Sequence, residues 1–133
     1  MIGEKNIEIL LSNLDPQMSE QIYLFCTLTE EQFSEVSLTP QAFFREEEGV
    51  TLVIRAEDEN KVSGTCFYPS RMITLRVHSS LEGVGLLAAL TKALAAEQIS
   101  VNAFSGFYHD HLFVKEEEAK SALEILQRFS CPV

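Results

Sequence analysis

The chain has 133 residues, with 20 acidic and 10 basic side chains, so its formal charge is −10 at neutral pH. Hydrophobic residues make up 46% and charged residues 23%, which is typical of a folded protein and excludes disordered and collagen-like chains. The length suits one compact domain or two small units that share a core. Phosphate recognition needs clustered lysine and arginine, so the acidic balance argues against nucleic acid and against an anionic membrane surface as partners.

A short helix and a strand are predicted over residues 7–28. The Asp15-Pro16 pair ends the helix, because the residue before a proline avoids helical dihedral angles. Residues 21–28 then alternate in the manner of a strand, and one of the two faces is fully apolar. The helical stripe consists of Ile7, Leu10, Leu11 and Leu14, and the apolar strand face of Ile22, Leu24, Cys26 and Leu28.

Two strands joined by a tight turn follow a short helical segment. Thr29 is placed to cap that segment, and Gln32 three residues later completes the pattern of a capping box. Gly49 predicts a tight hairpin connection between the two strands. The predicted elements are a helical turn over residues 29–33, strands over 42–46 and 50–54, and a short helix or turn over 57–61.

The second half of the chain predicts the element order β-α-β-β-α. Residues 71–79 alternate between apolar and polar side chains, as a half-buried strand does. A helix with a leucine seam follows from Val84 to about Gln98. Two helices of this kind can cover one face of an antiparallel sheet, which predicts an α+β fold of ferredoxin-like plan. The remaining elements are strands over 99–104 and 111–114 and a closing helix over 116–129.

Residues 64–70 form the predicted boundary between two halves, because glycine and proline here separate two periodic regions. We therefore expect two units, residues 1–65 and residues 70–133, of which the first is a poorer version of the same plan. No clear sequence repeat links the halves, so the inference of duplication depends on element order alone.

The cysteines and the chain ends predict the compartment. Cys26, Cys66 and Cys131 are widely spaced and form no CxxC pair, so we expect reduced thiols and no zinc site. No apolar run approaches the roughly 20 residues that cross a bilayer, and Met1 to Glu8 has no signal-peptide pattern. These features predict a cytoplasmic protein.

Four separated stretches of the chain carry a family resemblance: residues 25–27, 44–53, 73–86 and 108–114. In this order they resemble a family of small bacterial ACT-like proteins of unknown function, and the likeness spans about residues 5–130. The resemblance implies two ACT-type units, each with an antiparallel sheet covered by helices, and a homo-oligomer. ACT domains typically bind amino acids or other small metabolites and regulate enzymes or transporters, so the resemblance implies a non-enzymatic, ligand-sensing module.

The loop from Ser79 to Val84 is the predicted ligand site, because the usual ACT pocket lies at the loop after the first strand. Glycine at position 83 lets the backbone approach a ligand closely, and free N–H groups at the following helix start can hold a carboxylate. Many ACT domains carry a Pro-Gly pair in this loop, where this chain has Glu82-Gly83.

Side chains around the loop complete the predicted site. Ser79 and Ser80 add hydroxyl groups, and Glu82 can pair with an α-amino group, which suits an amino acid. Asn102 on the neighbouring strand can contact the same ligand in the ACT arrangement. The predicted ligand-binding residues are Ser79, Ser80, Leu81, Glu82, Gly83, Val84 and Asn102.

Two other functions are open from the residues alone. The loop can be a plain strand-to-helix turn, in which case the chain is a structural protein that only oligomerises. His109 and His111 share one face of a strand and can chelate a metal, with Asp110 pointing the other way, which would give a metal-dependent enzyme. We expect no catalytic residue, no metal and no cofactor.

Overall fold

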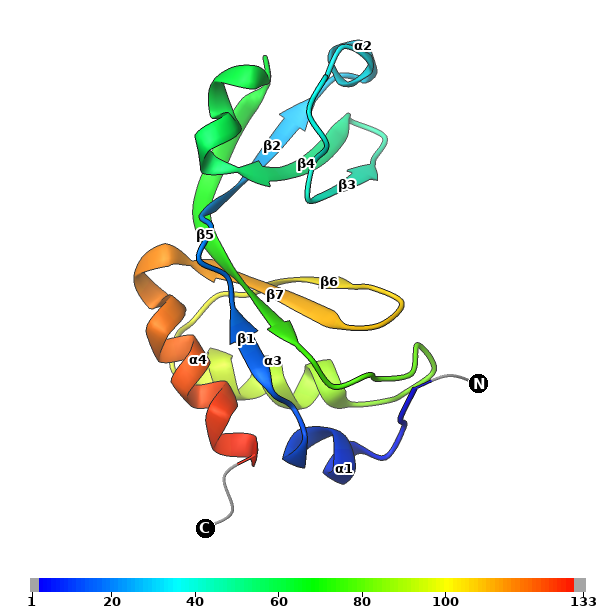
Figure 1. Ribbon diagram of the computed structural model, residues 1–133, viewed down its shortest axis with the longest axis vertical. Coiled ribbons are helices and arrows are strands. Elements are labelled where there is room, and N and C mark those ends of the chain that lie inside the picture. Colours follow the sequence, from blue (N-terminus) through cyan, green and yellow to red (C-terminus); the bar gives the residue numbers. More distant parts are fainter. Residues whose placement is uncertain (1–2, 131–133) are drawn as a thin grey trace. The chain divides into compact units, whose positions relative to one another are not determined.

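The computed structural model describes residues 3–130, which form two compact units (Figure 1). Unit 1 combines the residues up to Glu20 with those from Arg71 onward, and unit 2 consists of Gln21–Ser70. The sequence-based division into 1–65 and 70–133 assigns residues 3–20 to the first half, whereas spatial grouping assigns them to unit 1. The strand pairing described below explains this grouping.

Unit 2 is an antiparallel sheet with short helical segments. Its strands lie in the order β3-β4-β2-β5, and each neighbouring pair is antiparallel. The helical segments are only one to two turns long, as expected for the poorer of the two units. The elements are β2 (Tyr23–Leu28), α2 (Glu30–Ser34), β3 (Ala42–Arg45), β4 (Val50–Arg55), η1 (Ala56–Lys61) and the first part of β5 (Thr65–Leu75).

The core of unit 2 comes from the apolar face of β2 and the matching face of β4. Leu24, Cys26 and Leu28 are buried, as the alternation predicts. The predicted capping box is confirmed at the start of α2, where the Gln32 N–H donates to Thr29 Oγ1 over 3.0 Å. In return, the Thr29 N–H donates to Gln32 Oε1 over 2.8 Å.

The strands of unit 1 continue the seven-stranded sheet through β5, and α3 and α4 cover one face of them (Figure 1). Its strands lie in the order β1-β5-β7-β6. Leucines 90 and 94 of α3 are fully buried against Ile73 and Leu75 of β5. The elements are α1 (Ile7–Ser12), β1 (Pro16–Met18), the second part of β5, α3 (Leu86–Ala96), β6 (Asn102–Ser105), β7 (Asp110–Lys115), η2 (Glu116–Glu118), α4 (Ala119–Gln127) and η3 (Arg128–Ser130).

Both units have the same strand order, which confirms the α+β ferredoxin-like fold. In unit 2 the first to fourth strands of the ferredoxin-like plan are β2, β3, β4 and the first part of β5, and in unit 1 they are the second part of β5, β6, β7 and β1. In both units the spatial order of these strands is second, third, first, fourth. The fourth strand of unit 2 is the first part of β5, which continues as the first strand of unit 1. The fourth strand of unit 1 is β1, which precedes unit 2 in the chain, so residues 3–20 group with unit 1.

Several predicted element boundaries differ from the structure. The two units divide between Ser70 and Arg71, at the end of the predicted boundary over residues 64–70, but residues 65–70 are the first part of β5 and pair with β2. The strand predicted to Ser79 ends at Leu75, and α3 begins at Leu86 rather than Val84. Gly85 has a φ of +100°, a left-handed conformation that a helix cannot include, and it therefore sets the start of α3.

The expectation of reduced cysteines is also wrong for two of the three. Cys26 and Cys66 lie directly opposite each other on β2 and β5 and form a disulfide. Forty positions separate them in the sequence, and only the strand pairing brings them together. Cys131 lies outside the described residues.

We predict that reduction of the Cys26–Cys66 disulfide lowers the free energy of unfolding by about 2–4 kcal/mol, because the bond closes a loop that contains most of unit 2. Urea titrations with and without dithiothreitol measure this difference. The control is the Cys26→Ser, Cys66→Ser double variant, whose unfolding should not respond to the reductant. Equal midpoints for the oxidised and reduced wild type would contradict the prediction.

We predict that Thr29→Ala destabilises unit 2 by about 1 kcal/mol, because the Gln32 N–H loses its acceptor. Thr29→Ser is the matched control, since it keeps the hydroxyl group, and it should retain most of the stability. Thermal unfolding followed by circular dichroism measures both variants. An equal loss in the serine variant would assign the effect to the lost methyl group instead of the cap.

Candidate functional site

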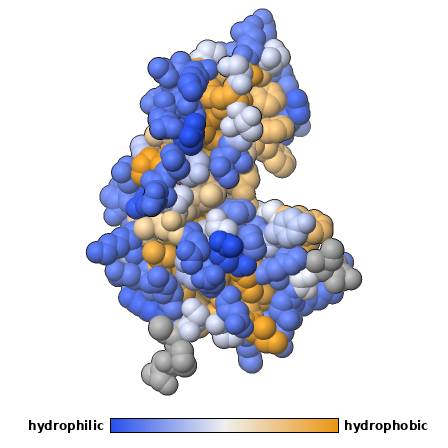
Figure 2. Space-filling model, in the orientation of Figure 1, coloured by the Kyte–Doolittle hydropathy of each residue, from blue (hydrophilic) through white to orange (hydrophobic). Residues whose placement is uncertain are grey.

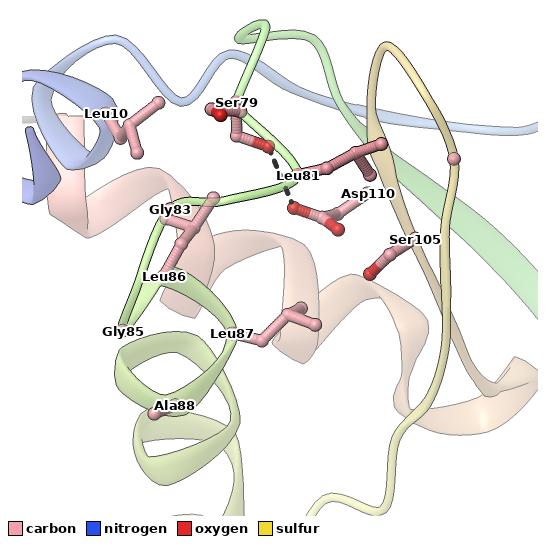
Figure 3. A pocket seen from close by; sticks show the side chains of 12 residues that line it. Leu10, Ser79, Leu81, Gly83, Gly85, Leu86, Leu87, Ala88, Ser105 and Asp110 are labelled. Carbon is pink, nitrogen blue, oxygen red and sulfur yellow. Dashed lines mark hydrogen bonds between the residues drawn. The ribbon is translucent and has the colours of Figure 1, made fainter. Parts of the chain in front are cut away.

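The segment between β5 and α3 borders a pocket of about 230 Å³ within unit 1 (Figure 3). We call residues Ser79–Val84 the site loop. The opposite wall is formed by the turn between β6 and β7, and the first turn of α3 closes the base. The lining residues are Leu10, Ser79, Ser80, Leu81, Gly83, Gly85, Leu86, Leu87, Ala88, Ser105, Gly106 and Asp110.

Four of the seven residues predicted from the sequence line this pocket: Ser79, Ser80, Leu81 and Gly83. The other three do not line it. The exposed Glu82 carboxylate lies 3.2 Å from the Lys5 ammonium group, and Val84 is 86% exposed. Asn102 is an exposed residue at the start of β6, where it pairs with Phe113.

Two backbone amides of the site loop, those of Glu82 and Gly83, are bonded within the loop itself. The Gly83 N–H donates to the Ser80 carbonyl over 3.0 Å, and the Glu82 N–H donates to Ser80 Oγ over 3.1 Å. The N–H groups of Glu82 and Gly83 are therefore already bonded, and the N–H groups at the start of the following helix, which the sequence predicts to hold a carboxylate, belong to α3. Gly85 offers no side-chain cap to α3, and Leu86, Leu87 and Ala88 of the first helical turn line the pocket. The first N–H groups of a helix have no intrahelical partner.

Asp110 at the start of β7 gives the pocket a buried carboxylate. Its side chain is 8% exposed, and its Oδ2 accepts from Ser79 Oγ over 3.2 Å. Ser105 is its direct neighbour in register on β6, and Figure 3 shows both side chains on the same side of the pocket. Within residues 3–130 no salt bridge includes Asp110. A buried carboxylate without a cationic partner is costly, so it favours a cationic group in the pocket.

Asp58 is a second buried acid among the described residues, and its carboxylate, unlike that of Asp110, has cationic partners. Asp58 in η1 of unit 2 is 6% exposed and contacts two cations, Arg55 at 3.2 Å and Lys61 at 3.0 Å. These hydrogen bonds, led by that of Lys61, hold the pKa of Asp58 below its ordinary value. Asp110 has a hydroxyl group in place of these cations.

Sequence reasoning missed Asp110, although its alternation contained the signal. Asp110 shares its strand face with Leu112 and Val114, both of which belong to the core of unit 1. An acid at the end of an apolar core face is the pattern that marks a buried carboxylate. From the sequence, Asp110 is predicted only to point away from the two neighbouring histidines.

The two histidines lie outside the pocket. The ring centroids of His109 and His111 are 6.5 Å apart, and His111 Nδ1 lies 2.9 Å from Thr74 Oγ1. Burial, and secondarily the charge of His109, lowers the pKa of His111, which favours a neutral imidazole. Across the described part of the chain, no three histidine, cysteine or acidic side chains gather in a way that could hold a metal ion.

No helix within residues 3–130 is both long enough and apolar enough to span a lipid bilayer.

Comparison with known proteins identifies the family. Two ACT domain models match the chain, one over residues 2–71 and the other over residues 68–128. A Vibrio cholerae protein of unknown function, described as a possible transport protein, is 42% identical, with a TM-score of 0.84 over 96% of this chain and 98% of that protein. No curated protein sequence matches the chain.

More distant solved structures share the fold alone. An Agrobacterium tumefaciens protein is 12% identical, with a TM-score of 0.71 over 86% of this chain and 87% of that one. The ligand-free regulatory subunit of aspartate kinase from Thermus thermophilus is 6% identical, with a TM-score of 0.68 over 86% of this chain and 96% of that subunit. ACT domains are typically regulatory modules without catalytic activity. Because one family model covers more than half of the sequence and the Vibrio cholerae relative matches it nearly end to end, this chain belongs to the ACT domain family.

Proposed function

We propose that this protein is a non-enzymatic regulatory module that binds an amino acid in the pocket of unit 1. The observation that carries the proposal is the buried carboxylate of Asp110, which lines the pocket without a cationic partner among residues 3–130. A free amino acid carries an ammonium group and a carboxylate. The Asp110 carboxylate is complementary to the first, and the start of α3 is complementary to the second.

Asp110, instead of the Glu82 predicted from the sequence, is the proposed partner of the ligand's ammonium group. The ammonium group of the ligand pairs with the Asp110 carboxylate, which is held in place by the Ser79 hydroxyl. The ligand carboxylate faces the N–H groups of Leu86, Leu87 and Ala88, where the partial positive charge of the α3 start favours an anion. Glu82 is exposed to solvent and already pairs with Lys5, so it is a poorer acceptor.

The pocket lining favours an aliphatic side chain on the ligand. Apart from Asp110 and the serines, the walls consist mainly of leucine, alanine and glycine. The volume of about 230 Å³ suits an amino acid of the size of valine or leucine. We therefore name L-valine and L-leucine as the preferred members of the ligand class.

We further propose a bacterial, cytoplasmic homo-oligomer, which membership of the ACT domain family supports. Phe43 and Phe44 on β3 support the association, because they are 48% and 64% exposed. Figure 2 shows apolar surface in the region of β3. Light scattering on a size-exclusion column measures the oligomeric state. A Cys26–Cys66 disulfide that persists in protein alkylated inside growing cells would argue against the cytoplasm, where thiols are kept reduced.

Calorimetry with each of the twenty amino acids at pH 7 tests the proposed function. We expect saturable binding of L-valine or L-leucine, and a rise in melting temperature with the same amino acids. Silence across the whole set, together with a stable oligomer, would favour the alternative of a structural protein that only oligomerises.

We predict that Asp110→Asn lowers the affinity for the best-binding aliphatic amino acid by about tenfold or more, because a charge-assisted hydrogen bond becomes a neutral one. Asparagine has nearly the same size as aspartate, so the fold should persist, which circular dichroism checks. Glu82→Gln is the matched control and should change the affinity less than about twofold. Loss of binding in the glutamine variant, with normal binding in the asparagine variant, would reverse the assignment.

A further inference from the structure

The segment before α1 lies along the site loop, although more than 70 positions separate them in the sequence. We call residues Gly3–Asn6 the strap. Glu4 forms a parallel bridge with Ser79, in which the Glu4 N–H donates to the His78 carbonyl over 2.9 Å and the Ser80 N–H donates to the Glu4 carbonyl over 2.9 Å. The strap thus bonds the backbone on both sides of Ser79.

These two bonds are the main tether of the loop. Within residues 3–130, no other backbone hydrogen bond joins residues 78–83 to a separate segment, because the bonds of Gly83 and Glu82 stay inside the loop. The Ser79 hydroxyl, which holds Asp110, lies between the two tethered positions. The position of this hydroxyl in the pocket therefore depends on the strap.

Gly3 fits its place only because it has no side chain. A Cβ atom there would lie 2.7 Å from the Ser80 nitrogen and 2.8 Å from the Ser79 carbonyl carbon, both of them backbone atoms that cannot rotate away. Its φ of +97° is also a conformation that other residues rarely adopt. Any substitution here pushes the strap and the loop apart.

The strap is itself anchored by the helix that follows it. Asn6 caps α1 by accepting from the N–H groups of Glu8 and Ile9, at 3.0 Å and 3.2 Å. Leu10 of the same helix is 2% exposed and lines the pocket. One continuous segment thus contributes both a wall of the pocket and the tether of its loop.

We propose that the strap is a positioning element of the ligand site, which holds the site loop in the shape that presents Ser79 to Asp110. The backbone bonds carry this role, whereas the exposed ion pair of Lys5 with Glu82 contributes little. The positioning role in binding rests on the proposed function, but the mechanical role of the strap does not require a ligand.

Gly3→Ala tests the proposal, with Lys5→Gln as the control within the same strap. Amide hydrogen exchange by NMR should show the Ser80 amide exchanging about tenfold or more faster in the alanine variant, and unchanged in the glutamine variant. The amides of Leu90 and Leu94, in the buried part of α3, should keep their protection in both variants, which separates a released loop from a damaged fold.

Calorimetry with L-leucine gives the second measurement. We expect the Gly3→Ala variant to bind at least about fivefold more weakly than the wild type, and Lys5→Gln to bind normally. Unchanged Ser80 exchange in Gly3→Ala would overturn the proposal, as would faster exchange with unchanged leucine affinity. If the wild type binds no leucine, the proposed ligand is wrong, and the exchange of Ser80 alone decides whether the strap holds the loop.

Discussion

The backbone pairing of β5 is the constraint on which the structure depends. This strand of 11 residues completes the sheet of unit 2 with its first part and begins the sheet of unit 1 with its second. The two units therefore share this strand. The same strand leads into the site loop, so the register of β5 determines where Ser79 and Ser80 lie.

The pocket follows from three backbone events after β5 ends. The strand gives way to a short turn stabilised by Ser80, the left-handed Gly85 stops the turn, and α3 starts with uncapped amides. On the other side, the alternation of β7 leaves the carboxylate of Asp110 on the core face. The Asp110 carboxylate and the start of α3 thus line one small cavity, which is the basis for proposing a zwitterionic ligand.

Local patterns predicted most of the fold, and long-range pairing accounts for what they missed. The alternation of β2 and the capping box of α2 are properties of neighbouring residues, and both are confirmed. The three-residue β1 and the Cys26–Cys66 disulfide exist only because distant strands meet, so no local signal reveals them. The predicted loop lines the pocket, but Asp110 comes from a different strand, and its role required knowledge of which face β7 buries.

The place of β1 has a consequence for the order in which the nascent chain can fold on the ribosome. Unit 2 is contiguous, so all of its strands are available once residues 21–70 have emerged, whereas β1 must wait for its partner strand β5. At a synthesis rate of about 5–20 residues per second, the apolar stripe that includes Leu10 and Leu14 stays uncovered for several seconds. During that interval, the stripe is exposed apolar surface that can associate with other apolar surfaces.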